Sequence, residues 1–141
     1  MKKIIALGSS KRVGKDLAAM LIYQELKIQY PNLRVTVAAF ADKLYEICNI
    51  LYGTGDKKYY EKHPEKKEEM LPIGLTFRNT LIKLGNTIVE NVYEHTWIDP
   101  VLNIDCDVLV ITDVRYMREL KALRNYAEPE NLRLIKIIRG D

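Results

Sequence analysis

The first twenty residues contain the feature that most constrains the fold. The short apolar run Ile4-Ile5-Ala6-Leu7 ends at Gly8, small and polar residues follow, and Gly14-Lys15 opens a segment with helical apolar spacing. Such a run is typical of a strand buried on both faces of a parallel sheet. The order of strand, glycine-containing loop and helix is that of a phosphate-binding P-loop.

This loop and the first turn of the helix supply candidate ligands for ATP and Mg²⁺. Backbone N–H groups of small residues can wrap a polyphosphate, and the helix N-terminus adds partial positive charge. Lys15 would reach the β- and γ-phosphates. Ser9 stands in place of the motif's first glycine and Asp16 in place of its hydroxyl, but an aspartate can hold Mg²⁺ directly or through water. The predicted nucleotide ligands are Ser9, Ser10, Lys11, Arg12, Val13, Gly14, Lys15 and Asp16. The alternative is an ordinary turn with a solvated Lys15.

Length and composition limit the classes of protein. The 141 residues predict a single domain, 48% hydrophobic and 29% charged, which is typical of a globular protein. A net charge of +3 is compatible with small anionic ligands and gives no reason to expect nucleic-acid binding. Cys48 and Cys106 lack metal-ligand spacing and are expected to be reduced thiols in a cytoplasmic protein. No apolar run reaches the length of a membrane span.

A second strand is predicted over residues 34–40, followed by a helix over residues 41–52 that ends at Gly53. Asp42 and Lys43 open this helix. In an open α/β sheet the ligand crevice lies beyond the carboxyl ends of the strands, so both side chains are candidates to bind the substrate. Asp42 could equally serve only as a helix cap.

Residues 53–75 form the most polar stretch and predict a mobile, helical or looped surface insertion. A longer helix is expected from Thr76, which can cap it. Its apolar stripe consists of Phe77, Leu81, Leu84, Ile88 and Val92. Arg78 lies in its first turn, where a cation is unfavourable with the helix dipole, so we expect an anionic partner there. Trp97 is expected to be a packing residue.

The third predicted strand, residues 106–115, is a continuous apolar run that ends in Asp113, with Arg115 two residues further on. P-loop proteins place the carboxylate that organises Mg²⁺ at the end of such a strand. Asp16 and Asp113 are therefore the candidate metal ligands. A helix over residues 117–126 and a fourth strand over residues 132–138 follow.

Taken together, these motifs resemble the deoxynucleoside monophosphate kinases of bacteriophages, a branch of the P-loop nucleotide kinases. The resemblance covers nearly the whole chain. The residues that carry it are Gly14-Lys15-Asp16, Phe40-Ala41-Asp42, Thr76-Phe77-Arg78, Leu84-Gly85, Trp97, Asp113-Val114-Arg115 and Glu119. It implies a three-layer α/β fold with a parallel sheet between helices, and transfer of the γ-phosphoryl of ATP to a deoxynucleoside 5′-monophosphate.

The resemblance also implies roles for single residues. Lys15, Arg78, Asp113 and Arg115 would be catalytic, and Asp42, Lys43, Arg78 and Arg115 would bind the substrate. The family continues beyond the equivalent of Asp141 into a cationic lid and a further strand, so it implies a sheet truncated after its fourth strand, poor turnover and an exposed edge open to homodimer formation. Two alternatives remain: a small-molecule kinase similar to the phosphomevalonate kinases, and a catalytically inactive nucleotide-binding module.

Overall fold

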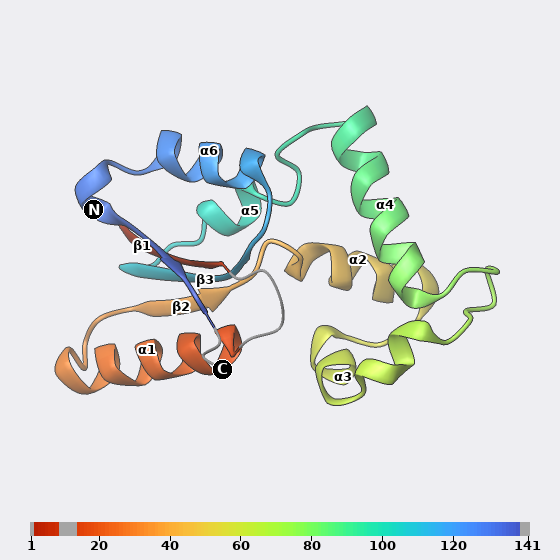
Figure 1. Cartoon of the computed structure of the whole chain (residues 1–141), viewed down its shortest axis with the longest axis horizontal. Coiled ribbons are helices and arrows are strands. Elements are labelled where there is room, and N and C mark those ends of the chain that lie inside the picture. The colour runs from red at the N-terminus through yellow and green to blue at the C-terminus, as the bar shows by residue number, and fades with distance from the viewer. Residues whose placement is uncertain (1, 9–13, 139–141) are drawn as a thin grey trace. The chain divides into compact units, whose positions relative to one another are not determined.

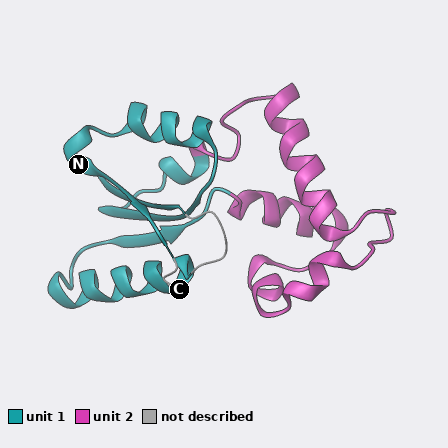
Figure 2. Cartoon of the chain, viewed as in Figure 1, with its two compact units in different colours: residues 1–40, 100–141 teal, residues 41–99 magenta. Residues whose placement is uncertain are grey.

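A computed structural model of the protein describes residues 2–8 and 14–138. The chain forms two compact units, shown in Figure 2. The first consists of Met1–Phe40 and Pro100–Asp141, and the second of Ala41–Asp99. The predicted polar insertion, residues 53–75, lies inside the second unit.

The first unit is built on a four-stranded, all-parallel sheet, which confirms the predicted α/β class. Its strands are β1 (Lys3–Gly8), β2 (Val35–Ala38), β3 (Val108–Val114) and β4 (Leu132–Lys136), in the order β2-β3-β1-β4. Helix α1 (Lys15–Gln29) covers one face, and α6 (Met117–Tyr126) with the short α5 (Asp99–Leu102) covers the other, as Figure 1 shows. A 3₁₀ turn, η2 (Pro129–Asn131), leads into β4.

The core of this unit is centred on β3. Leu109, Val110 and Ile111 are completely buried, as expected for a continuous apolar run with strands on both sides. On the α1 side, Leu7 and Val110 pack with Ala19 of the helix. Each fully buried aliphatic side chain stabilises the fold by about 1.5–3 kcal/mol relative to an exposed one.

Because all strands are parallel, the carboxyl ends of β1, β2 and β3 lie at one edge of the sheet. β1 ends at Gly8, which pairs with Val114. A Cβ atom at Gly8 would lie 3.1 Å from the carbonyl oxygen of Val114. The glycine therefore lets the ends of β1 and β3 approach closely.

The second unit is helical. It contains α2 (Asp42–Tyr52), α3 (Lys57–Lys62), the 3₁₀ helix η1 (Pro64–Glu68) and α4 (Phe77–Asn91). Its helix ends follow the sequence: Gly53 adopts the left-handed conformation at the end of α2, and the hydroxyl of Thr76 accepts the N–H of Asn79 at the start of α4. Asp56 caps α3 by accepting the N–H of Tyr59 at 2.8 Å.

An aromatic cluster forms the core of the second unit. Tyr60 and Phe77 stack with ring centroids 3.7 Å apart, and Tyr45 packs beside both. Tyr60 is only 3% exposed although it lies in the stretch predicted as a polar surface insertion. The charges of that stretch concealed a core residue, because α3 is too short to show an apolar period.

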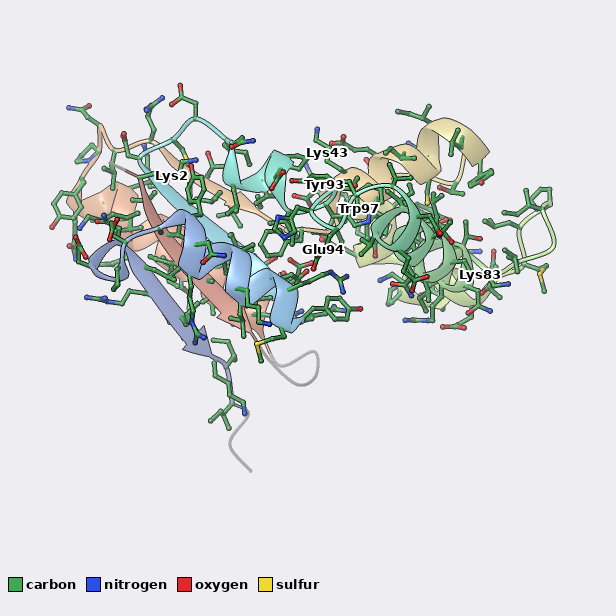
Figure 3. The ribbon with its side chains drawn as sticks, turned by 90° about the horizontal axis from the view of Figure 1, so that it is seen from above. Lys2, Lys43, Lys83, Tyr93, Glu94 and Trp97 are labelled. Atoms are coloured by element: carbon green, nitrogen blue, oxygen red, sulfur yellow. The ribbon has the colours of Figure 1, made fainter. Side chains whose placement is uncertain are left out.

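The segment from α4 to Trp97 agrees with the sequence in part. Trp97, labelled in Figure 3, is buried, in line with the predicted packing role, and its Nε1 donates to the carbonyl oxygen of Gly85 at 3.2 Å. A Cβ atom at Gly85 would lie 3.0 Å from the Leu44 side chain, so this position favours glycine within a helix. Val92 was wrongly placed in the apolar stripe: α4 ends at Asn91, and Val92 is 77% exposed.

Candidate functional site

The start of α1 is marked by a glycine in the left-handed conformation. Gly14 adopts the left-handed conformation, with φ 78°, immediately before the helix, and its carbonyl oxygen accepts the N–H of Ala18 at 2.9 Å. A residue with a side chain would be strained there. Gly14 stands at the N-cap and has no side chain that could accept the first N–H groups of α1, as the usual capping residues do.

Two predicted ligands follow Gly14 directly. Lys15 is the first residue of α1 and is half-buried, and Asp16 is exposed in the same turn. Both therefore belong to the helix end that the motif assigns to the nucleotide. The other predicted loop ligands, Ser9, Ser10, Lys11, Arg12 and Val13, lie outside the described residues.

Asp113 lies near the carboxyl end of β3, which pairs with β1, the strand that precedes α1 in the chain. It is the last residue but one of β3, whose end pairs with Gly8 at the end of β1. Its Oδ1 accepts the backbone N–H of Phe40 at 2.9 Å. The carboxylate thus joins the end of β3 to the chain that leaves β2, a contact that sequence reasoning did not identify.

The turn after β3 is held by a second carboxylate. Oε1 of Glu119 accepts the backbone N–H of Arg115 at 2.7 Å and that of Tyr116 at 2.9 Å. Glu119 is 6% exposed, and this burial raises its pKa; the negative charge of Asp113 acts in the same direction, while the two N–H groups oppose the shift. The Arg115 side chain, by contrast, is exposed.

The candidates on α2 have different partners. Nζ of Lys57 lies 2.8 Å from Oδ1 of Asp42, both about one-third exposed, whereas Lys43 pairs with Glu46 at 3.1 Å (Lys43 is labelled in Figure 3). The N-cap of α2 is Ala41 and has no side-chain cap, so the alternative that Asp42 is only the cap is wrong. The sequence did not predict the pairing of Lys57 with Asp42, because Lys57 lies in a stretch of mixed charge that was interpreted as a solvated surface.

The expected anionic partner of Arg78 is present within the protein. Nε of Arg78 donates to Oε1 of Glu68, which belongs to η1. Both side chains are more than 40% exposed, so the pair contributes about 0–1 kcal/mol to stability. An anionic ligand could therefore replace Glu68 at small cost.

The candidate metal ligands are of the chemical type that Mg²⁺ prefers. Mg²⁺ is commonly bound by one or two carboxylates together with phosphate oxygens and water, and Asp16 and Asp113 are carboxylates. Residues 2–8 and 14–138 contain no group of three or more His, Cys, Asp or Glu side chains that could hold a metal ion on their own. These two residues would thus need the oxygens of the nucleotide to complete a magnesium site.

These observations define the class of protein: an α/β fold with an all-parallel sheet, whose strand ends gather a glycine-led helix, an aspartate and an arginine. Comparison of the sequence with protein-family models and with curated proteins gave no match. Within the described part of the chain, no helix has both the length and the apolar character needed to cross a membrane.

Proposed function

We propose that this protein transfers the γ-phosphoryl group of ATP to a deoxynucleoside 5′-monophosphate. One observation supports this most: the left-handed Gly14 opens α1 directly before Lys15, while Asp113 is the last residue but one of β3, the strand that pairs with β1. A P-loop kinase needs these groups on adjacent strands, because the lysine and the carboxylate act on the same polyphosphate.

In this proposal the protein acts by positioning and by neutralising charge. Lys15 and the N-terminus of α1 would bind the phosphates of ATP. Mg²⁺, held with Asp16 and Asp113, would offset the charge of the phosphates. Arg115 would stabilise the transferred group, because its guanidinium is exposed beyond the end of β3.

The acceptor would be bound by residues of the second unit. Asp42, Lys43 and Arg78 were assigned to it from the sequence, and Lys57 joins them because it is paired with Asp42. A guanidinium in a surface ion pair can exchange a carboxylate for a phosphate and can bind the phosphate with two parallel hydrogen bonds. We therefore infer that Arg78 contacts the monophosphate.

A catalytically inactive nucleotide-binding module is the second candidate. The ion pair between Arg78 and Glu68 favours it, because it already satisfies the arginine that would bind the acceptor. The two candidates differ in turnover but share the nucleotide site.

A coupled assay of ADP release with MgATP separates them, using panels of deoxynucleoside and ribonucleoside monophosphates and phosphomevalonate as acceptors. We expect turnover with at least one deoxynucleotide. Calorimetry with MgATP should show that Lys15→Ala binds at least tenfold more weakly, since a charged hydrogen bond contributes about 1.5–3 kcal/mol. Lys121→Ala, an exposed lysine of α6, is the control and should bind normally. ATP binding without turnover on any acceptor would favour the inactive module, and equal affinity of Lys15→Ala and wild type would contradict both candidates.

A further inference from the structure

Glu119 is a buried carboxylate that serves the backbone of a turn. It lies in the first turn of α6, is 6% exposed, and binds the N–H groups of Arg115 and Tyr116 through one oxygen, Oε1. Burying a carboxylate is costly unless hydrogen bonds compensate for the lost water. An uncharged residue would avoid this cost, so the contact to the turn calls for a specific explanation.

The turn that Glu119 holds carries Arg115, whose side chain is exposed. The guanidinium of Arg115 is exposed and makes no hydrogen bond or ion pair with any residue in ranges 2–8 and 14–138. Two other arginines of the described chain form ion pairs: Arg34 with Asp105 and Asp107, and Arg78 with Glu68. At Arg115 the backbone is fixed while the charged end of the side chain is available.

The same segment is fixed on its other side. Two residues before Arg115, Asp113 accepts the N–H of Phe40, and Val114 pairs with Gly8 in the sheet. Residues 113–116 are thus held by a carboxylate at each end and by the sheet between them. Such restraint limits where the base of the Arg115 side chain can lie.

We propose that Glu119 is a positioning residue that anchors the backbone of Arg115 and thereby directs the arginine's guanidinium toward the phosphoryl group of a bound nucleotide. This role rests on the proposed function. Glu119 acts through Arg115 and does not touch the nucleotide. A displacement of about 1 Å at a reacting group can cost about a hundredfold in rate, so an anchor of this kind has a measurable effect.

The alternative is a purely structural role, in which Glu119 only stabilises the start of α6. A glutamate at the third helical position that accepts the N–H of the residue before the helix is half of a capping box. That contact explains the bond to Tyr116 but does not require the shorter bond to Arg115. The two roles predict different results when Arg115 is removed.

The test is a double-mutant cycle on turnover with MgATP and the preferred monophosphate. Glu119→Ala should lower kcat/KM about tenfold, and Glu119→Gln, whose amide oxygen can still accept both N–H groups, should retain it within about threefold. Leu123→Val is the control: it weakens packing of the same helix at a completely buried residue and should leave kcat/KM unchanged. In the Arg115→Ala background, Glu119→Ala should cause no further loss.

Losses that add in the double variant, or an equal loss in Leu123→Val, would overturn the positioning role. Amide hydrogen exchange provides a readout that needs no substrate: the N–H groups of Arg115 and Tyr116 should exchange faster in Glu119→Ala than in Glu119→Gln. Equal exchange in these variants would also overturn it. Failure of the proposed function is recognised separately, because wild-type protein would then transfer no phosphate to any acceptor.

Discussion

At the scale of single residues, Asp113 illustrates how one side chain can serve both the fold and the proposed chemistry. Its Oδ1 accepts the N–H of Phe40, and the same carboxylate is a candidate ligand of Mg²⁺. The sequence predicted the second role, because an acid ended a buried apolar run. It could not predict the first, because a contact between residues 40 and 113 depends on how two distant strands pair.

The two roles of Asp113 can be separated by substitution. Asp113→Asn retains an oxygen for the N–H of Phe40 but loses the charge, whereas Asp113→Ala loses both. We expect Asp113→Ala to lower the free energy of unfolding by about 1–3 kcal/mol and Asp113→Asn to lower it much less. Both variants should lose most of the proposed phosphoryl-transfer activity. Urea denaturation and turnover measure the two effects, and full activity in Asp113→Asn would exclude the carboxylate from the reaction.

The ion pair between Arg78 and Glu68 allows a second prediction at this scale. If Arg78 binds the monophosphate, Glu68 competes with that ligand. Arg78→Ala should therefore raise KM for the monophosphate, while Glu68→Gln should lower it by a few-fold, because a surface pair is worth only about 0–1 kcal/mol. Steady-state kinetics at saturating MgATP measure both. An altered affinity for ATP with an unchanged KM for the monophosphate would show that Arg78 serves the donor side.

At the scale of elements, the local sequence predicted helices and strands correctly where apolar residues form a clear run or period, and where a glycine or a capping residue marks a helix end. The apolar run over residues 106–115 predicted a buried strand, which the structure shows as β3 (Val108–Val114), and Gly53 and Thr76 marked helix ends that the structure confirms. Tyr60 was missed because its burial depends on Phe77, seventeen positions away, and on Tyr45. Local periodicity contains no information about such contacts between elements.

The start of the parallel sheet is fixed by a carboxylate, which gives a prediction about pH. Asp107, just before β3, accepts the backbone N–H of Arg34, just before β2, at 2.9 Å and also pairs with its guanidinium. These contacts, the backbone N–H above all, lower the pKa of Asp107 below its ordinary value of 3.8. A lowered pKa in the folded state means that this stabilisation is present above the unfolded pKa and is lost as pH falls through the folded one.

We therefore expect Asp107→Asn to be less stable than wild type at neutral pH, and the difference to shrink as the pH is lowered below about 3.8. Urea denaturation at a series of pH values measures this. Asp105→Asn is the matched control, because Asp105 pairs with the same arginine but is 89% exposed at its side chain, so its loss should change stability very little. A difference between Asp107→Asn and wild type that grows on acidification would contradict the assignment.

At the scale of the whole molecule, the chain leaves its first unit after Phe40 and returns at Pro100. The sequence indicated an insertion at residues 53–75 by its charge, whereas the second compact unit runs from Ala41 to Asp99. The difference has a physical cause: α2 and α4 supply Tyr45 and Phe77 to the aromatic cluster, so they belong with α3 although their composition is ordinary. The composition of the sequence therefore located a polar surface segment, but the bounds of the second unit depend on which side chains of α2, α3 and α4 pack together.

The last prediction concerns an edge of the sheet. Within the described residues β4 pairs on one side only, with β1, and its Leu134 and Ile135 are 42% and 40% exposed. An edge strand with free backbone groups and exposed apolar side chains is a site for pairing with another chain. In an antiparallel pair of two copies centred on Leu134, Arg133 faces Ile135 and Lys136 faces Leu132. The cations therefore do not face each other directly. Like charges that face each other across two strands would destabilise the pair.

We expect concentration-dependent dimers by sedimentation velocity, formed through β4. Leu134→Lys would place two lysines face to face at the centre of the pair and should shift the protein to monomers. Val92→Lys, at a more exposed apolar residue of the second unit, adds the same charge elsewhere and should leave the equilibrium unchanged. A wild-type protein that stays monomeric at all concentrations, or a dimer that persists in Leu134→Lys, would show that this edge is not a site of self-association.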